Sequence, residues 1–216
     1  MTYEGFYAKG MKEGYGELKK PNGYVYRGSW VQDKKTGAGF EERPSGDTYE
    51  GNFLDDRHEG FGIEKVVQTG EVYRGNFFSN IRMGKGHFTL PDGYVYDGMW
   101  EKNEATGFGK ELLPSGEKYE GEFINMKRDG KGKCTFVNGE VYEGDWDNGV
   151  QHGKGKLTRQ DGYSYNGDWV QGEMTGKGFE VNVNSETYEG DFVIGVRHGK
   201  GKYSYINGEV YEGDFS

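Results

Sequence analysis

Only one cysteine, Cys134, occurs among the 216 residues, so the chain can form no internal disulfide and its composition fits a reducing compartment such as the cytoplasm. Basic residues are outnumbered, because 27 Lys and Arg stand against 36 Asp and Glu and give a net charge of −9. This balance disfavours nonspecific binding to nucleic acid, which needs a basic surface. Long apolar runs are also missing, so the sequence predicts neither a membrane-spanning helix nor a signal peptide.

Proline is rare as well, with four residues, and Leu, Ile and Val are scarce. Glycine and aromatic residues are abundant instead: the chain has 40 Gly, 17 Tyr, 13 Phe and 4 Trp. Disordered chains are poor in aromatic residues. The composition therefore predicts a folded protein in which a row of aromatic rings replaces the usual aliphatic core.

A single motif, Tyr-x-Gly-x-aromatic, recurs along the whole chain. Successive motifs are 23 residues apart, with one interval of 24, and two glycines follow at positions 11 and 13 when the tyrosine is counted as position 0. Self-similarity at such a fixed period indicates a repeat architecture in which each unit packs on its neighbours. The tyrosines at position 0 are Tyr3, Tyr26, Tyr49, Tyr73, Tyr96, Tyr119, Tyr142, Tyr165, Tyr188 and Tyr211.

Each repeat is predicted to form a β-hairpin. The tyrosine, the glycine and the second aromatic residue occupy alternate positions of the first strand and so share one face. We expect the second strand to begin at the glycine pair, with position 4 opposite position 11, position 2 opposite 13 and position 0 opposite 15. The larger ring would then lie over a cross-strand glycine. Segments such as PNG and PDG predict three-residue loops to the next repeat.

Position 15 falls on the aromatic face in this arrangement, and an apolar residue is expected there. Five repeats agree: Leu18, Phe88, Cys134, Leu157 and Tyr203. Four repeats carry glutamate instead, which the hairpin pattern does not explain: Glu41, Glu64, Glu111 and Glu180.

The motif in VYEGDW, together with the glycine pair, resembles the MORN repeat (membrane occupation and recognition nexus), whose pattern is close to YEGxWxxGxxxGxGxxxxxxGxx. The resemblance covers residues 1–216 as a single array of nine complete repeats and the first strand of a tenth. It implies an all-β fold, an elongated, twisted, single-layer antiparallel sheet of about 19 strands. Because the chain opens inside a repeat, it looks like a segment cut from a longer protein.

Chains made only of such repeats are most similar to the cytoskeletal scaffold members of the family in protozoan parasites. The resemblance therefore implies a non-enzymatic scaffold or spacer for cytoskeletal or membrane-associated proteins in the cytoplasm, with no cofactor. Carboxylates recur at the same place in successive repeats, which is typical of a solvated face and not of a unique catalytic group. Two alternatives are a phosphoinositide-headgroup-binding module and a regulatory arm of a larger enzyme.

Lysines gather at positions 12 and 14 from the sixth repeat onward, on the face opposite the aromatic row. They are the candidates for contact with phosphoinositide headgroups. The predicted register also places acidic residues opposite these lysines, and such cross-strand pairs stabilise sheets modestly. We therefore expect lipid binding to be weak. The lysines are Lys131, Lys133, Lys154, Lys156, Lys177, Lys200 and Lys202.

Apolar residues occupy the same face in the first half of the chain. Exposed apolar patches usually mark interaction sites, so these residues predict a partner-binding stripe. The alternative is that strand twist tucks the rings inward. The stripe consists of Tyr15, Phe40, Phe61, Ile63 and Phe108.

The sequence ends on a first strand, EVYEGDFS, which is followed by no second strand. Unpaired strand edges favour association, so we expect a homodimer joined through the C-terminal repeats. Its interface would contain Tyr188, Phe192, Tyr211 and Phe215. No metal site is expected within one chain, and His198 is the candidate ligand for a metal ion shared between chains.

Overall fold

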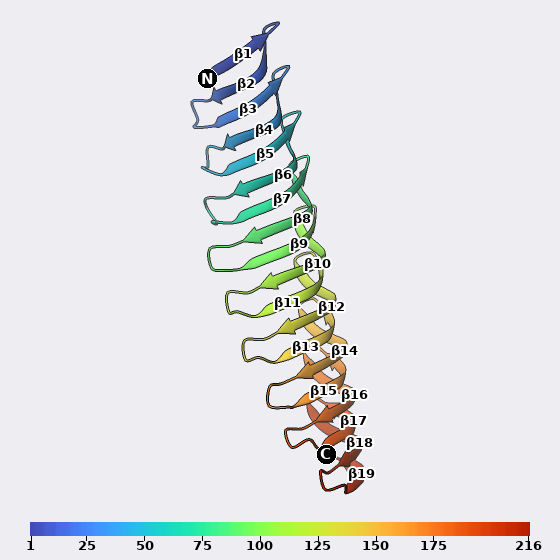
Figure 1. Ribbon diagram of the computed structural model, residues 1–216. Coiled ribbons are helices and arrows are strands. Elements are labelled where there is room, and N and C mark those ends of the chain that lie inside the picture. Colours follow the sequence, from blue (N-terminus) through green and yellow to red (C-terminus); the bar gives the residue numbers. More distant parts are fainter. The chain divides into compact units, whose positions relative to one another are not determined.

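The computed structural model describes all residues from 1 to 216 and contains 19 β-strands, with no helix long and apolar enough to cross a membrane. Two compact units divide the chain, unit 1 (residues 1–106) and unit 2 (residues 107–216), and β10 (Glu104–Leu112) contains the boundary. Within each unit, successive strands pair antiparallel in sequence order (Figure 1). The predicted all-β fold of antiparallel hairpins is confirmed.

The strands have a regular alternation of lengths, because each repeat contributes a shorter first strand and a longer second strand. In unit 1 they are β1 (Thr2–Ala8), β2 (Met11–Lys19), β3 (Val25–Val31), β4 (Lys34–Glu42), β5 (Thr48–Leu54), β6 (Arg57–Lys65), β7 (Val72–Phe78), β8 (Ile81–Thr89) and β9 (Val95–Glu101). After β10, unit 2 contains β11 (Lys118–Ile124), β12 (Lys127–Thr135), β13 (Val141–Asp147), β14 (Val150–Thr158), β15 (Ser164–Val170), β16 (Glu173–Val181), β17 (Thr187–Val193), β18 (Val196–Ser204) and β19 (Val210–Phe215).

The loops between repeats have the predicted three-residue form, except for the loop at residues 67–70, which has four residues. In the first, the backbone N–H of Lys20 donates to the carbonyl of Tyr24 at 2.9 Å and the N–H of Gly23 donates to the carbonyl of Lys20 at 3.1 Å. Residues 21–23 are thereby enclosed as a tight turn. Gly23 has a φ of 90°, the left-handed conformation that such a turn requires at its last position.

The register inside each hairpin differs from the prediction at one end. Positions 0 and 15 and positions 2 and 13 face each other as expected, but a β-bulge then shifts the pairing, so that position 4 faces position 9, as Tyr7 faces Lys12. The second strand begins at position 8, which is Met11 in the first repeat. Gly14, at position 11, has a φ of 68° and faces Trp30 of the next repeat. The chain therefore needs this glycine for the bulge and not to accommodate a ring of its own hairpin.

The tyrosine ring, and not the larger aromatic ring, lies over the glycine pair at positions 2 and 13. A Cβ atom added to Gly155 would overlap the Tyr142 ring, and one added to Gly144 would lie 2.5 Å from the carbonyl oxygen of Lys154. The Tyr142 hydroxyl donates to the carbonyl of Asp145 at 2.8 Å. The pair of glycines thus allows a whole tyrosine ring to lie flat against the backbone of a sheet that has no second layer.

The rings at positions 0 and 4 form a continuous row within each unit, which we call the aromatic seam. Tyr142 packs edge to face on Trp146 of its own repeat and on Trp169 of the next, with ring centroids 5.2 and 5.1 Å apart. The position-0 tyrosines from Tyr26 to Tyr188 are at most 1% exposed. Edge-to-face contacts contribute about 0.5–1.5 kcal/mol each beyond burial, so the seam serves as the core of each unit.

Candidate interaction surfaces

Charged side chains cover the aromatic seam where an apolar row is expected. Glutamate at position 15 pairs with a cation at position 9 of the next repeat: Glu64 with Arg82 at 2.9 Å and Glu180 with Arg197 at 2.6 Å. Each guanidinium also lies over a seam tyrosine, as Arg82 does 4.9 Å from the ring centroid of Tyr73. Burial alone would lower the pKa of Arg197, but the hydrogen bond and ion pair with Glu180 outweigh this effect and raise it, so the guanidinium stays charged.

This pairing explains the four glutamates and was visible in the sequence as a relation between neighbouring repeats. One cation at position 9 departs from this rule. Lys35 follows the repeat that carries apolar Leu18 at position 15, and it pairs with Glu41 of its own repeat at 3.2 Å. The glutamates Glu41, Glu64, Glu111 and Glu180 are followed at position 9 by His58, Arg82, Arg128 and Arg197, whereas the apolar residues Phe88, Cys134 and Leu157 are followed by Ala105, Gln151 and Met174.

Glu41 is the centre of the most buried charge cluster. Its carboxylate contacts Lys35 Nζ at 3.2 Å and His58 Nε2 at 3.1 Å, and the imidazole of His58 stacks on the Tyr49 ring with centroids 3.5 Å apart. Burial opposes ionisation, but the hydrogen bond with His58 and the charge of Lys35 hold the pKa of Glu41 at about 2. This cluster stabilises the seam, and no group of three or more His, Cys, Asp or Glu side chains is placed to hold a metal ion.

The face opposite the seam, which we call the reverse face, carries the side chains of positions 1, 3, 12 and 14. In unit 2 five of the seven expected lysines pair with acidic residues on a neighbouring strand, but the partner belongs to the next repeat and not, as predicted, to the same hairpin. Lys177 contacts Asp191 at 2.6 Å and Lys200 contacts Asp214 at 2.7 Å. Lys131, Lys133 and Lys154 pair in the same way with Asp145, Glu143 and Asp168, whereas Lys156 and Lys202 form no ion pair.

In unit 1 the reverse face contains a shallow groove of about 720 Å³, lined by apolar side chains together with Arg27, Glu50 and Asn52. Tyr15 and Phe61 are 70% and 57% exposed, and Phe40 and Ile63 are half-buried. The two most exposed rings are therefore not tucked inward by strand twist. The fifth residue of the expected stripe, Phe108, is 56% exposed in unit 2, where it lines a hollow of its own with lysines and glutamates.

Units 1 and 2 share one backbone pattern. A tyrosine ring covers the glycine pair at positions 2 and 13, and the glycine at position 11 of the second strand has a left-handed backbone. A family model for the MORN repeat matches nine segments of the chain, residues 3–23, 26–48, 49–65, 73–93, 96–118, 119–141, 142–162, 165–186 and 188–210. The chain belongs to the MORN repeat family. No curated protein sequence matches this MORN-repeat chain.

Solved structures resemble this MORN-repeat chain at low sequence identity. The TCP10 domain of Danio rerio CPAP, solved in complex with a peptide of Danio rerio STIL, is 8% identical with a TM-score of 0.51, and the match covers 99% of this chain and 100% of that domain. The TCP domain of Drosophila melanogaster SAS-4, solved with a proline-rich motif of Ana2, is 11% identical with a TM-score of 0.43 and coverages of 93% and 90%.

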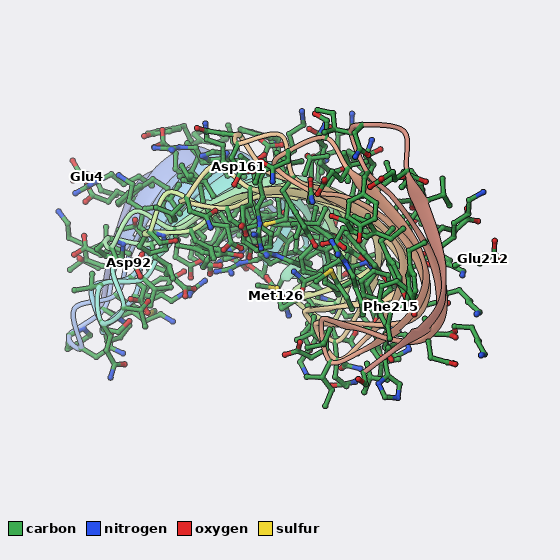
Figure 2. All side chains as sticks on the ribbon, turned by 90° about the horizontal axis from the view of Figure 1, so that it is seen from below. Glu4, Asp92, Met126, Asp161, Glu212 and Phe215 are labelled. Atoms are coloured by element: carbon green, nitrogen blue, oxygen red, sulfur yellow. The ribbon has the colours of Figure 1, made fainter.

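The residues expected at a dimer contact differ in accessibility. Tyr188 and Phe192 are buried in the seam of their own MORN repeats, so neither can touch a second copy directly. Tyr211 is 45% exposed, and Phe215 is half-buried against Tyr188, with ring centroids 4.7 Å apart. Phe215 and Glu212 project from opposite sides of β19 (Figure 2), as the alternation of a strand requires. His198 is exposed on β18.

Proposed function

We propose that this chain is a non-enzymatic scaffold that binds other proteins through the reverse face of unit 1. The observation that carries the proposal is the apolar groove, where Tyr15 and Phe61 are more than half exposed. Soluble proteins seldom leave large rings together in water unless another surface covers them. We further propose that the nine MORN repeats and the first strand of a tenth act as one array that displays this groove.

The repeats themselves provide an internal comparison. At position 12, where unit 1 has Tyr15 and Phe61, the four hairpins from β11 onward carry lysine, and they fold with the same register. The MORN hairpin therefore does not need an apolar residue at this place. Aromatic side chains that the fold does not require are best explained by contact with a partner.

The structural likeness supports the same class of function. The Danio rerio CPAP domain shares the fold and was solved with a peptide of STIL bound. A single-layer sheet presents both of its faces to partners along its length, which suits a scaffold. We place the protein in the cytoplasm in association with the cytoskeleton, in keeping with the scaffold members that the repeat resembles.

Two further associations form part of the proposal. We propose a homodimer in which Tyr211 and Phe215 of β19 meet the same residues of a second copy, since Tyr211 exposes a large ring at that strand. The second candidate function is weak binding of phosphoinositide headgroups. Lys156 and Lys202 favour it, because they are the two lysines of the reverse face without an ion pair among the seven expected there.

The scaffold function is tested by capture of partners from an extract of the source cells. The full chain and a Tyr15→Lys, Phe61→Lys variant are immobilised, and bound proteins are quantified by mass spectrometry. Both substitutions install the residue that unit 2 carries at the same position, so the variant should melt at the same temperature as the wild type. We expect a set of proteins that only the wild type retains. Equal retention of every protein by both chains would contradict a partner site on this face.

A further inference from the structure

The reverse face of unit 1 contains one acidic side chain in an apolar setting. Along the row formed by positions 1 and 14, Glu50 of β5 lies between Phe40 of β4 and Ile63 of β6. Glu50 is exposed and forms no ion pair. In unit 2, Glu120 and Glu143 at the same position are neutralised, since Glu120 contacts Lys110 at 3.1 Å and Glu143 contacts Lys133 at 3.6 Å. Glu50 is thus a carboxylate whose cross-strand neighbours cannot balance its charge.

The adjacent row, formed by positions 3 and 12, provides a hollow beside this carboxylate. Ala38 of β4 stands between the exposed rings of Tyr15 on β2 and Phe61 on β6, and the small side chain leaves the space between the rings open. The two rings lie on strands separated by four strand spacings, about 19 Å. Opposite Ala38 is Asn52, whose side-chain amide has no hydrogen-bond partner within the chain.

We infer that this groove binds an extended segment of another protein that carries one Lys or Arg flanked by bulky apolar residues. The basic residue pairs with Glu50, and the apolar residues fill the hollow between Tyr15 and Phe61. The inference rests on the proposed scaffold function and adds the chemistry of the partner. A negatively charged ligand is disfavoured, because Arg27, the cation that also lines the groove, is paired with Glu17 at 3.1 Å, whereas Glu50 forms no ion pair.

An extended segment fits better than a helix for a reason of hydrogen bonding. The backbone groups of the sheet are already used by the strand pairing, so the groove offers side-chain donors only: the amide of Asn52, the hydroxyl of Tyr15 and the guanidinium of Arg27. A polyproline-II segment has free carbonyl groups that can accept these hydrogen bonds, whereas the carbonyl groups of a helix are occupied. At a rise of 3.1 Å per residue, about six residues span the 19 Å between the two rings.

The experiment is a selection of random 12-residue peptides displayed on phage against the full chain, followed by fluorescence polarisation with synthetic labelled copies of the enriched peptides. We expect enriched sequences with one Lys or Arg between apolar residues. Tyr15→Lys or Phe61→Lys should weaken their binding by about thirtyfold, as truncation of a central aromatic anchor does. The matched control is Phe179→Lys, an aromatic residue of the same face in unit 2, which should leave binding unchanged.

A charge exchange tests the role of Glu50. We expect Glu50→Lys to bind the selected peptides at least about tenfold more weakly and to recover binding when the basic residue of the peptide is replaced by Glu. Enriched peptides without a basic residue, or binding that the Glu50 exchange does not change, would overturn the inference. If peptides or proteins bind but the variants at Tyr15, Phe61 and Glu50 have no effect, the inference fails while a scaffold function elsewhere on the chain remains. If neither the peptides nor the capture experiment yields a groove-dependent partner, both fail.

Discussion

Replacement of one glycine by alanine tests the explanation of the aromatic seam most directly. Gly144 has no left-handed backbone, so alanine is conformationally acceptable there. An added Cβ would nevertheless lie 2.5 Å from the carbonyl oxygen of Lys154 and 2.7 Å from the Tyr142 hydroxyl. The first atom belongs to the backbone of a paired strand, and the second to a fully buried ring. Because neither can move freely, we expect Gly144→Ala to destabilise by about 3 kcal/mol, the upper end of the range for an overpacked core.

The matched control is Gly149→Ala in the hairpin loop of the same repeat. Gly149 has a φ of 92°, and an added Cβ would meet nothing within 4 Å. This variant therefore measures the cost of left-handed backbone alone, about 1–2 kcal/mol. Urea denaturation followed by tryptophan fluorescence gives both values relative to the wild type. The account of the seam is refuted if Gly144→Ala is as stable as the wild type or no less stable than Gly149→Ala.

Four further results are expected. Trp146→Ala should lower the free energy of unfolding by about 3 kcal/mol, which calorimetry or urea denaturation can check. Gly153→Val should be comparably harmful, because its backbone is left-handed and a Cβ would lie 2.7 Å from the Asp145 carboxylate; a rescue by Asp145→Ala would separate this clash from backbone strain. The pKa of Glu41 is lowered to about 2 from an ordinary value near 4.5, so the stabilisation that its carboxylate contributes is complete above pH 4.5 and is lost as the pH falls towards 2. Glu41→Gln should remove this part of the pH dependence of Tm. An acid profile of Tm that the substitution leaves unchanged would contradict the assignment. Tyr211→Asp should convert the proposed dimer to a monomer by light scattering, and a variant that keeps the mass of the wild type excludes β19 as the interface.

The hairpins could be predicted from the sequence because the same pattern recurs in every repeat. The alternation of Tyr142, Gly144 and Trp146 recurs in every unit, so the seam face and the pairing of position 0 with position 15 follow from side-chain period and loop length alone. The β-bulge could not be found in this way. A glycine required for left-handed backbone and a glycine required for space look identical in a sequence, and Gly153 is of the first kind while Gly155 is of the second.

The charge pairs over the seam show a different limit. Glu64 and Arg82 are 18 residues apart, and neither belongs to the motif that defines the repeat, so a search for what the repeats share overlooks them. Their relation appears only when one repeat is compared with the next. The positions that recur identify the fold, and the positions that vary in a coupled way identify contacts between neighbouring repeats.

The reverse face follows neither rule, and this is why it can carry function. Its side chains contact no second layer, so lysine at position 12 of unit 2 and aromatic residues at the same position of unit 1 are compatible with one backbone. In unit 2 each position-12 lysine is paired with an aspartate of the next repeat, as Lys177 is with Asp191, so the charges at this position are balanced within the chain. In unit 1 the rings of Tyr15 and Phe61 and the carboxylate of Glu50 have no such balance within the chain. A partner that supplies apolar surface and one positive charge would provide it.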